Sequence, residues 1–73
     1  MTKFELQAIV ARNIRKQRKI HGLTIAEMAS LLDLTPGAFG LIERGDRGLT
    51  IHNLFKLSNI FGQPTDYFFL GTT

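Results

Sequence analysis

Apolar residues recur every three or four positions over the first part of the chain, which is the period of an α-helix with one buried side. From about Phe4 to His21, the residues that stack on one side are Leu6, Val10, Ile14, Gln17 and His21. The residues on the opposite side are basic: Arg12, Arg15, Lys16 and Lys19. The pattern predicts a long amphipathic helix whose basic side faces solvent, although a direct role in binding an anion stays open.

Threonine precedes each of the next three apolar stretches, and threonine is favoured immediately before a helix. Thr24 is followed three positions later by Glu27, the spacing of a capping box, and Thr35 is followed by Pro36, which suits a first helical turn. Thr50 opens a further helix. The expected inward positions are Ile25, Met28, Ala29 and Leu32, then Leu34, Phe39 and Ile42. The helix after Thr50 carries Ile51, Leu54, Phe55, Leu57 and Phe61.

Glycine follows the end of most of these stretches, as expected for the residue just past a helix. The positions are Gly22, Gly45, Gly62 and Gly71. A short fifth helix is predicted over about 64–70, and no stretch has the alternating pattern of a strand. The sequence therefore predicts one all-α domain over residues 1–73.

The second and third predicted helices are separated by only about two residues, so they must cross steeply. Such a crossing needs a small residue on the first helix, and Ala29 provides it. Asp33 stands in the turn, where a left-handed backbone is expected and aspartate is tolerated. Residues from about 24 to 44 are therefore predicted to form a helix-turn-helix.

Several stretches together resemble the Cro/CI-type (XRE-like) helix-turn-helix regulators of phages and bacteria. They are Ile14-Arg15 with Arg18, Gly22-Leu23-Thr24, Met28-Ala29, Leu32, Leu34-Thr35, Ile42-Glu43-Arg44-Gly45, Leu54, Lys56-Leu57 and Pro64-Thr65-Asp66-Tyr67. The resemblance implies a compact five-helix, lambda-repressor-like domain that binds operator DNA as a homodimer, most often as a repressor, with its third helix in the major groove. It also implies a structural ion pair between Arg18 and Glu43.

Composition favours this class over enzymes and metalloproteins. The net charge of +3 and the pI near 9.8 favour an anionic partner. Cysteine is absent, and His21 and His52 lie in separate predicted helices, so neither a metal site nor another cofactor is expected. No membrane-length apolar run or catalytic motif is present, so we expect a cytoplasmic protein that is not an enzyme and has no membrane partner.

Candidate DNA contacts are of two kinds, contacts to phosphates and contacts to bases. Helix starts can bind phosphates through free amides. The resemblance adds the arginines around Gly45-Asp46 as phosphate contacts, where the negative charge of Asp46 acts against its neighbour Arg47. The outer face of the third helix would face the bases but has no side chain for bidentate reading. The complete set is Thr24, Ile25, Thr35, Pro36, Gly37, Ala38, Gly40, Leu41, Arg44, Arg47 and Thr50.

This unusual outer face leaves three interpretations open. Ala38 or Leu41 can contact thymine methyl groups, with DNA shape adding preference. Gly37 and Gly40 can let the helix backbone approach the groove closely. Alternatively, the face binds a protein, and the domain is an antirepressor, an antitoxin-like partner or an oligomerisation module.

The C-terminal apolar cluster is larger than a short helix can bury against its own domain. Its members are Tyr67, Phe68, Phe69 and Leu70. Part of it is expected in the core and the rest at a homodimer contact, which agrees with pairing through the C-terminal helix in the family that the chain resembles. Packing over the core, or a further C-terminal domain, is the alternative.

Overall fold

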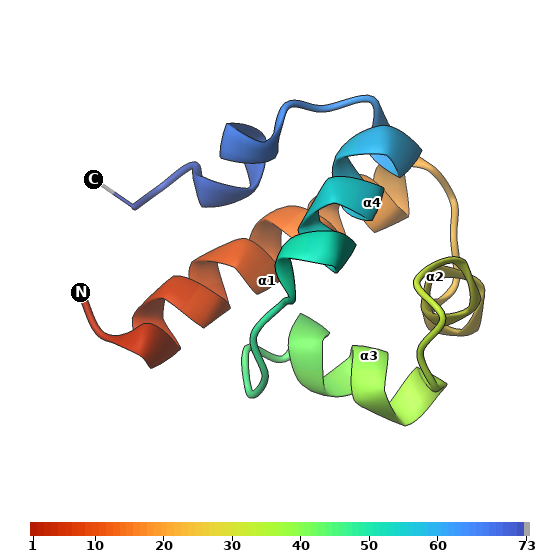
Figure 1. Cartoon of the computed structure of the whole chain (residues 1–73), viewed down its shortest axis with the longest axis horizontal. Helices are drawn as coiled ribbons and strands as arrows, with labels where there is room; N and C mark the ends of the chain where they lie inside the picture. Colours follow the sequence, from red (N-terminus) through yellow and green to blue (C-terminus); the bar gives the residue numbers. More distant parts are fainter. Residues whose placement is uncertain (73) are drawn as a thin grey trace.

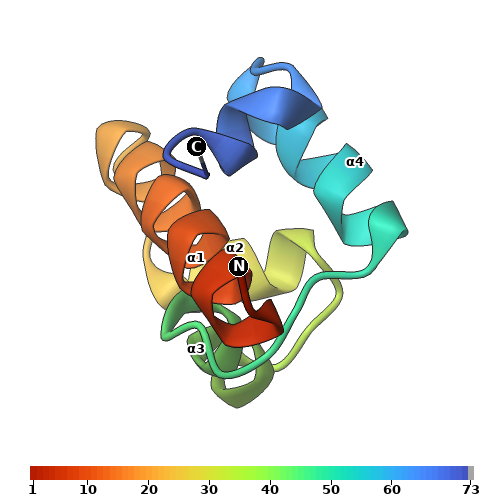
Figure 2. The same cartoon turned by 90° about the vertical axis from the view of Figure 1, so that its left-hand side faces the viewer.

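The computed structural model describes residues 1–72 and consists of helices. They are α1 (Lys3–Ile20), α2 (Ile25–Leu31), α3 (Pro36–Glu43), α4 (Ile51–Phe61) and the 3₁₀ helix η1 (Thr65–Phe69). Figure 1 shows α1 running along the molecule, with α2 and α3 at one end and on one side. Figure 2, which looks from the side, places α4 opposite α1, with the C-terminal segment between their upper ends. The all-α prediction is confirmed.

The fifth helix differs from the expected α-helix because it is a 3₁₀ helix. The amide of Tyr67 donates to the carbonyl of Pro64 and the amide of Leu70 to that of Tyr67, both across three residues. A segment of only five residues has too few α-type bonds to offset the cost of starting an α-helix.

Threonine hydroxyls fix the start of each α-helix. Thr24, Thr35 and Thr50 accept hydrogen bonds from the amides of Glu27, Ala38 and Asn53 respectively. The carboxylate of Glu27 also accepts from the amide of Thr24, which completes the expected capping box. A further capping box starts α1, where Thr2 and Glu5 have the same spacing and bond reciprocally. The sequence therefore located the helix starts to within about one residue.

The core is apolar and draws on every helix. Its buried members are Val10, Ile14, Met28, Ala29, Leu32, Phe39, Ile42, Leu57, Phe61 and Phe68. The inward positions predicted for Leu6, His21 and Ile25 are wrong, because these side chains are exposed. The buried side of α1 instead includes Ala11 and Asn13, since η1 packs along that side.

Polar side chains of α1 fasten the C-terminal segment. The Nδ2 atom of Asn13 donates to the carbonyls of Phe68 and Leu70 at 2.8 and 3.0 Å, and Nη2 of Arg12 donates to the Leu70 carbonyl at 2.9 Å. Nε2 of Gln17 lies 3.1 Å from the Tyr67 hydroxyl. The expected basic face of α1 is thus only partly free, because Arg12 makes a structural contact.

The helix-turn-helix has the predicted steep crossing. The axes of α2 and α3 differ by 104°, and Ala29 at the contact is fully buried. Asp33 has a φ of 56°, as expected for the left-handed turn position, and its carboxylate lies 2.8 Å from Nζ of Lys56 on α4. In residues 1–72 no single helix is long and apolar enough to cross a membrane, although α2 and α3 satisfy those criteria as a bent pair.

Candidate nucleic-acid interface

The outer side of α3 lies opposite its buried residues Phe39 and Ile42. At 100° per residue, Gly37, Leu41 and Arg44 occupy the middle of this side, with Ala38 and Gly40 at its borders. Leu41 is 37% exposed, Ala38 and Gly40 are half-buried, and the other predicted contact residues are exposed. The structure therefore leaves the predicted DNA-facing set accessible.

Gly37 and Gly40 are not required by the packing of this chain. Neither has a positive φ, and a Cβ atom built at either position would meet no heavy atom within 4 Å. Alanine would stabilise a helix by about 1 kcal/mol relative to glycine at each position. The fold alone therefore does not account for these two glycines.

A buried ion pair attaches the last residue of α3 to α1. Nη2 of Arg18 lies 2.6 Å from Oε1 of Glu43, and Nε lies 2.9 and 3.1 Å from the two carboxylate oxygens. Nη1 of Arg18 also donates to the carbonyl of Leu23. The side chains are only 13% and 7% exposed. The hydrogen bonds to Glu43 raise the pKa of Arg18 further, so the pair expected from the sequence is present and charged.

Arg15 strengthens the same junction. Its Nη1 atom donates to the backbone carbonyl of Glu43 at 3.0 Å, and the side chain is half-buried. This carbonyl lies at the end of α3, where an arginine also interacts favourably with the helix dipole. Arg15 therefore does not belong to the solvated basic face predicted for α1. Of that group, only Lys16 and Lys19 are exposed and make no side-chain hydrogen bond or ion pair with residues 1–72.

The loop that leaves α3 is held against the first turns of α1. Nε2 of Gln7 donates to the Gly45 carbonyl at 3.0 Å. Gly45 has a φ of 81°, and a Cβ atom there would lie 3.0 Å from the Cα atom of Ala8, so only glycine fits. This close approach fixes where the following residues of the loop emerge.

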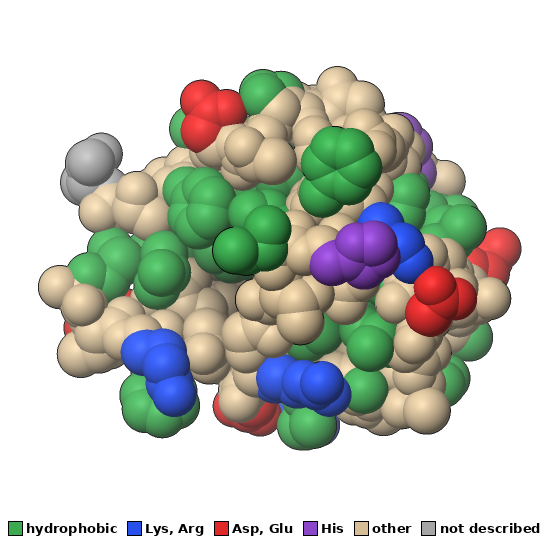
Figure 3. Space-filling view, viewed as in Figure 1, with side chains coloured by type: hydrophobic (Ala, Val, Ile, Leu, Met, Phe, Trp, Pro, Cys, Tyr) green, Lys and Arg blue, Asp and Glu red, His purple; other side chains and the backbone are tan. Residues whose placement is uncertain are grey.

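The arginines of this loop differ in their partners. Nε of Arg44 lies 3.3 Å from Oδ2 of Asp46, and both side chains are more than half exposed. Asp46 thus pairs with Arg44, whereas its place next to Arg47 in the sequence predicts an effect on that arginine. Arg47 is exposed and has no ion pair with residues 1–72. Figure 3 shows basic side chains along the lower edge of the molecule, the edge that Figure 1 places beside α3 and the start of α1.

The C-terminal residues proposed for a dimer contact do not all reach the surface. Phe68 is fully buried in the core of its own chain, so it cannot contact a partner, and Tyr67 is half-buried with its hydroxyl bonded to Gln17. Phe69 and Leu70 are 36% and 57% exposed. Phe55 on α4 is 61% exposed and adds a further apolar side chain to the surface.

The two histidines have separate surroundings. The ring of His21 packs against Phe61, with 5.0 Å between the ring centroids, and His52 is exposed at the start of α4. Within residues 1–72, no three His, Asp or Glu side chains are grouped so that they could hold a metal ion.

A family model and solved structures of other proteins match this chain. The model of a family described as Helix-turn-helix, HTH_3, matches residues 14–68. A crystal structure of an HTH_3 family transcriptional regulator from Vibrio cholerae is 28% identical with a TM-score of 0.78, covering 93% of this chain and 38% of that chain. The chain therefore spans well under half the length of that regulator.

A second solved structure shows the same fold over its full length. It is the restriction-modification controller protein C.AhdI from Aeromonas hydrophila, with a TM-score of 0.82 and 23% identity. The match covers 94% of this chain and 100% of the controller. A search of curated proteins found no match.

Proposed function

Because the chain belongs to the HTH_3 helix-turn-helix family, we propose that it regulates transcription by binding double-stranded DNA with α3 in the major groove. The observation that carries this proposal is the accessible surface formed by the outer side of α3 together with three helix starts and the loop after α3. Thr24, Thr35 and Thr50 are all exposed at those starts. Amides of first helical turns and the two exposed arginines of the loop suit phosphate contacts.

Rigid support of this surface is the second requirement for DNA recognition. The buried pair of Arg18 and Glu43 fixes α3 to α1, and the bond from Gln7 to Gly45 fixes the loop. Such supports fix the backbone of Arg44 at the end of α3 and that of Arg47 in the loop that follows. Phosphate contacts from fixed positions set the register of a protein on the duplex.

Base reading by this domain depends on apolar contact and shape. Between Pro36 and Leu41, the outer side of α3 offers Leu41 and Ala38 for thymine methyl groups and offers no bidentate hydrogen-bonding side chain. Gly37 and Gly40 leave open space that lets the helix backbone approach the groove. We therefore expect modest sequence preference that responds to groove width and DNA flexibility.

Two copies of the chain are proposed to bind one operator. Phe69 and Leu70 present apolar surface at the C-terminal segment, and joining two copies there would place the α3 helices on half-sites about 34 Å apart. A dimer over a promoter would block transcription, so repression is the expected outcome. The site of action is the cytoplasm, where the DNA of a phage or bacterium lies.

Selection of bound sequences from random duplexes tests the proposal, with sizing of the selected complex. We expect an enriched palindrome bound by two chains and a steep loss of affinity with salt. Arg47→Gln should reduce the double-logarithmic salt slope by about 0.9 if Arg47 neutralises one phosphate. Lys19→Gln removes an exposed charge at the far end of α1 and is the matched control. Absence of binding even at low salt would favour the protein-interaction alternative.

A further inference from the structure

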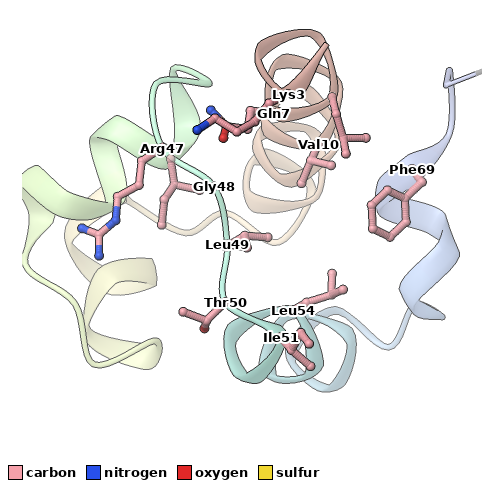
Figure 4. A pocket seen from close by; sticks show the side chains of 12 residues that line it. Lys3, Gln7, Val10, Arg47, Gly48, Leu49, Thr50, Ile51, Leu54 and Phe69 are labelled. Atoms are coloured by element: carbon pink, nitrogen blue, oxygen red, sulfur yellow. The ribbon is translucent and has the colours of Figure 1, made fainter. Parts of the chain in front are cut away.

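An apolar groove lies beside the proposed DNA surface. Figure 4 shows it between α1, the loop of residues 47–50, the first turns of α4 and η1. Its volume is about 300 Å³, at the small end of the range for small-molecule sites of roughly 300–1,000 Å³. The apolar walls are formed by Leu6, Val10, Ile42, Leu49, Leu54 and Phe69.

The charges around this groove have one sign. Its lining contains Lys3 and Arg47 and no carboxylate. Lys3 has its Nζ atom 5.5 Å from the ring centroid of Phe4 and makes no ion pair within residues 1–72. Figure 4 shows the guanidinium of Arg47 turned away from the groove, so its methylene stem contributes to the wall. The ammonium group of Lys3 lies over the ring of Phe4, which is outside the groove lining, so Lys3 meets a ligand inside the groove by turning away from that ring.

The N-terminus of α4 adds to the positive potential. This helix of eleven residues begins with Ile51, next to its cap Thr50, and both residues line the groove. Amides in the first turn of a helix carry partial positive charge. An apolar channel bordered by an ammonium group and a helix start is complementary to a molecule with an alkyl chain and an anionic head.

We propose that the groove binds a single-chain carboxylate, such as a medium-chain fatty acid. The alkyl chain lies along the apolar walls, and the carboxylate pairs with the ammonium group of Lys3. A nucleotide or a sugar would require more hydrogen-bonding groups than these walls supply. A neutral hydrocarbon would form no ion pair with the positive charges of the lining.

The loop of residues 47–50 belongs both to the groove and to the proposed DNA surface, so a ligand in the groove would affect DNA binding. Arg47 and Thr50 form part of the groove lining and also belong to the proposed phosphate contacts. A ligand that shifts this loop would change DNA affinity. This regulatory consequence rests on the proposed function, whereas ligand binding itself does not and is measured without DNA.

The direct test is calorimetric titration of the full chain with octanoate, nonanoate and decanoate below their micelle-forming concentrations. One ligand should bind per chain, and each added methylene should strengthen binding about fourfold until the groove is full. Decanol, which has the same chain without the charge, should bind more weakly than decanoate. Failure of all three carboxylates to bind saturably, or affinity independent of chain length, would overturn the proposal.

Substitutions locate the site. Lys3→Gln should abolish the preference for decanoate over decanol, and Leu6→Glu should weaken decanoate binding at least tenfold by placing a like charge at the wall. Lys16→Gln and Ile20→Glu are the matched controls, since both residues are exposed on α1 outside the groove. Circular dichroism checks that each variant is folded.

Equal effects of variants and controls would contradict the proposed site. A second copy of the chain is the other candidate occupant. Sizing decides this, because a wild-type dimer that binds no decanoate and that Leu6→Glu converts to monomers would assign the groove to the dimer contact and overturn the ligand proposal.

Discussion

Glu43 combines a charge with nearly complete burial, and this makes it the side chain whose loss should cost most. Its side chain is 7% exposed, and its carboxylate accepts hydrogen bonds from Nε and Nη2 of Arg18. Removing one partner of a buried pair costs about 3–5 kcal/mol, because the remaining charge stays desolvated. The pair positions α3 and does not itself face the DNA surface.

Glu43→Ala should therefore lower the free energy of unfolding by about 3 kcal/mol, followed by thermal circular dichroism as a fall of at least about 12 °C in Tm. DNA affinity measured well below that temperature should change little. Asp46→Ala is the matched control, since its pair with Arg44 is exposed and such pairs contribute about 0–1 kcal/mol. Equal shifts in the two variants would contradict a stabilising role for the buried pair.

Asp33 should couple stability to pH. The hydrogen bond from Lys56 and the charge of that lysine lower the pKa of Asp33 below its usual 3.8. A group whose pKa is lower in the folded state stabilises the fold above its unfolded pKa, and this contribution is lost as the pH falls through the folded value.

Urea unfolding between pH 6 and pH 2, measured on wild type and Asp33→Asn, tests whether Asp33 makes the free energy of unfolding depend on pH. The variant should lose the part of the acid-side slope that comes from Asp33, and asparagine also tolerates the φ of 56°. Asp66→Asn serves as the control, because Asp66 is exposed and makes no ion pair with residues 1–72. Parallel pH profiles for wild type and Asp33→Asn would disprove the coupling.

Local signals in the sequence were sufficient to predict the helices but not all of their faces. Threonine caps depend on neighbours three residues away, so Thr24, Thr35 and Thr50 could be identified from sequence alone. The roles of Asn13 and Arg15 depend on backbone carbonyls that are 28 or more residues away along the chain. No period or spacing reveals such contacts, so the buried side of α1 was predicted only in part.

The outer side of α3 contains two glycines, Gly37 and Gly40, although glycine is unfavourable inside a helix. Gly37→Ala and Gly40→Ala should each stabilise the protein by up to about 1 kcal/mol, since the added Cβ meets no atom. Gly62→Ala is the matched control, because it also has open space but a φ of 64°, and should destabilise by about 1 kcal/mol. Chemical denaturation measures all three.

DNA binding by these α3 variants separates the interpretations of this surface. If the backbone of α3 approaches the groove closely, Gly37→Ala and Gly40→Ala should weaken DNA binding while they stabilise the fold. Leu41→Ala should weaken binding instead if apolar contact with thymine methyl groups dominates. Unchanged DNA affinity in all three variants would show that α3 does not contact the bases.

At the scale of the whole molecule, some groups of the C-terminal segment attach it to the domain, and others are exposed at the surface. Phe68 enters the core, and the backbone carbonyl of Leu70 accepts hydrogen bonds from Asn13 and Arg12. The side chain of Leu70 remains 57% exposed. The apolar cluster in the sequence predicts a buried part and an exposed part but does not assign them to residues, because a 3₁₀ helix turns its side chains differently from an α-helix.

Leu70→Glu should therefore convert the proposed homodimer into monomers without lowering Tm by more than a few degrees, because the anchoring bonds involve only the backbone of Leu70. Analytical ultracentrifugation over a range of protein concentrations measures the change. Ile20→Glu adds the same charge at an exposed apolar position at the far end of α1 and should leave the dimer intact. The Leu70→Glu monomer should still bind a half-site, since the helix-turn-helix is unaltered, but should lose the affinity gained from joining two half-sites. A Leu70→Glu protein that remains dimeric would place the contact between copies elsewhere on the domain.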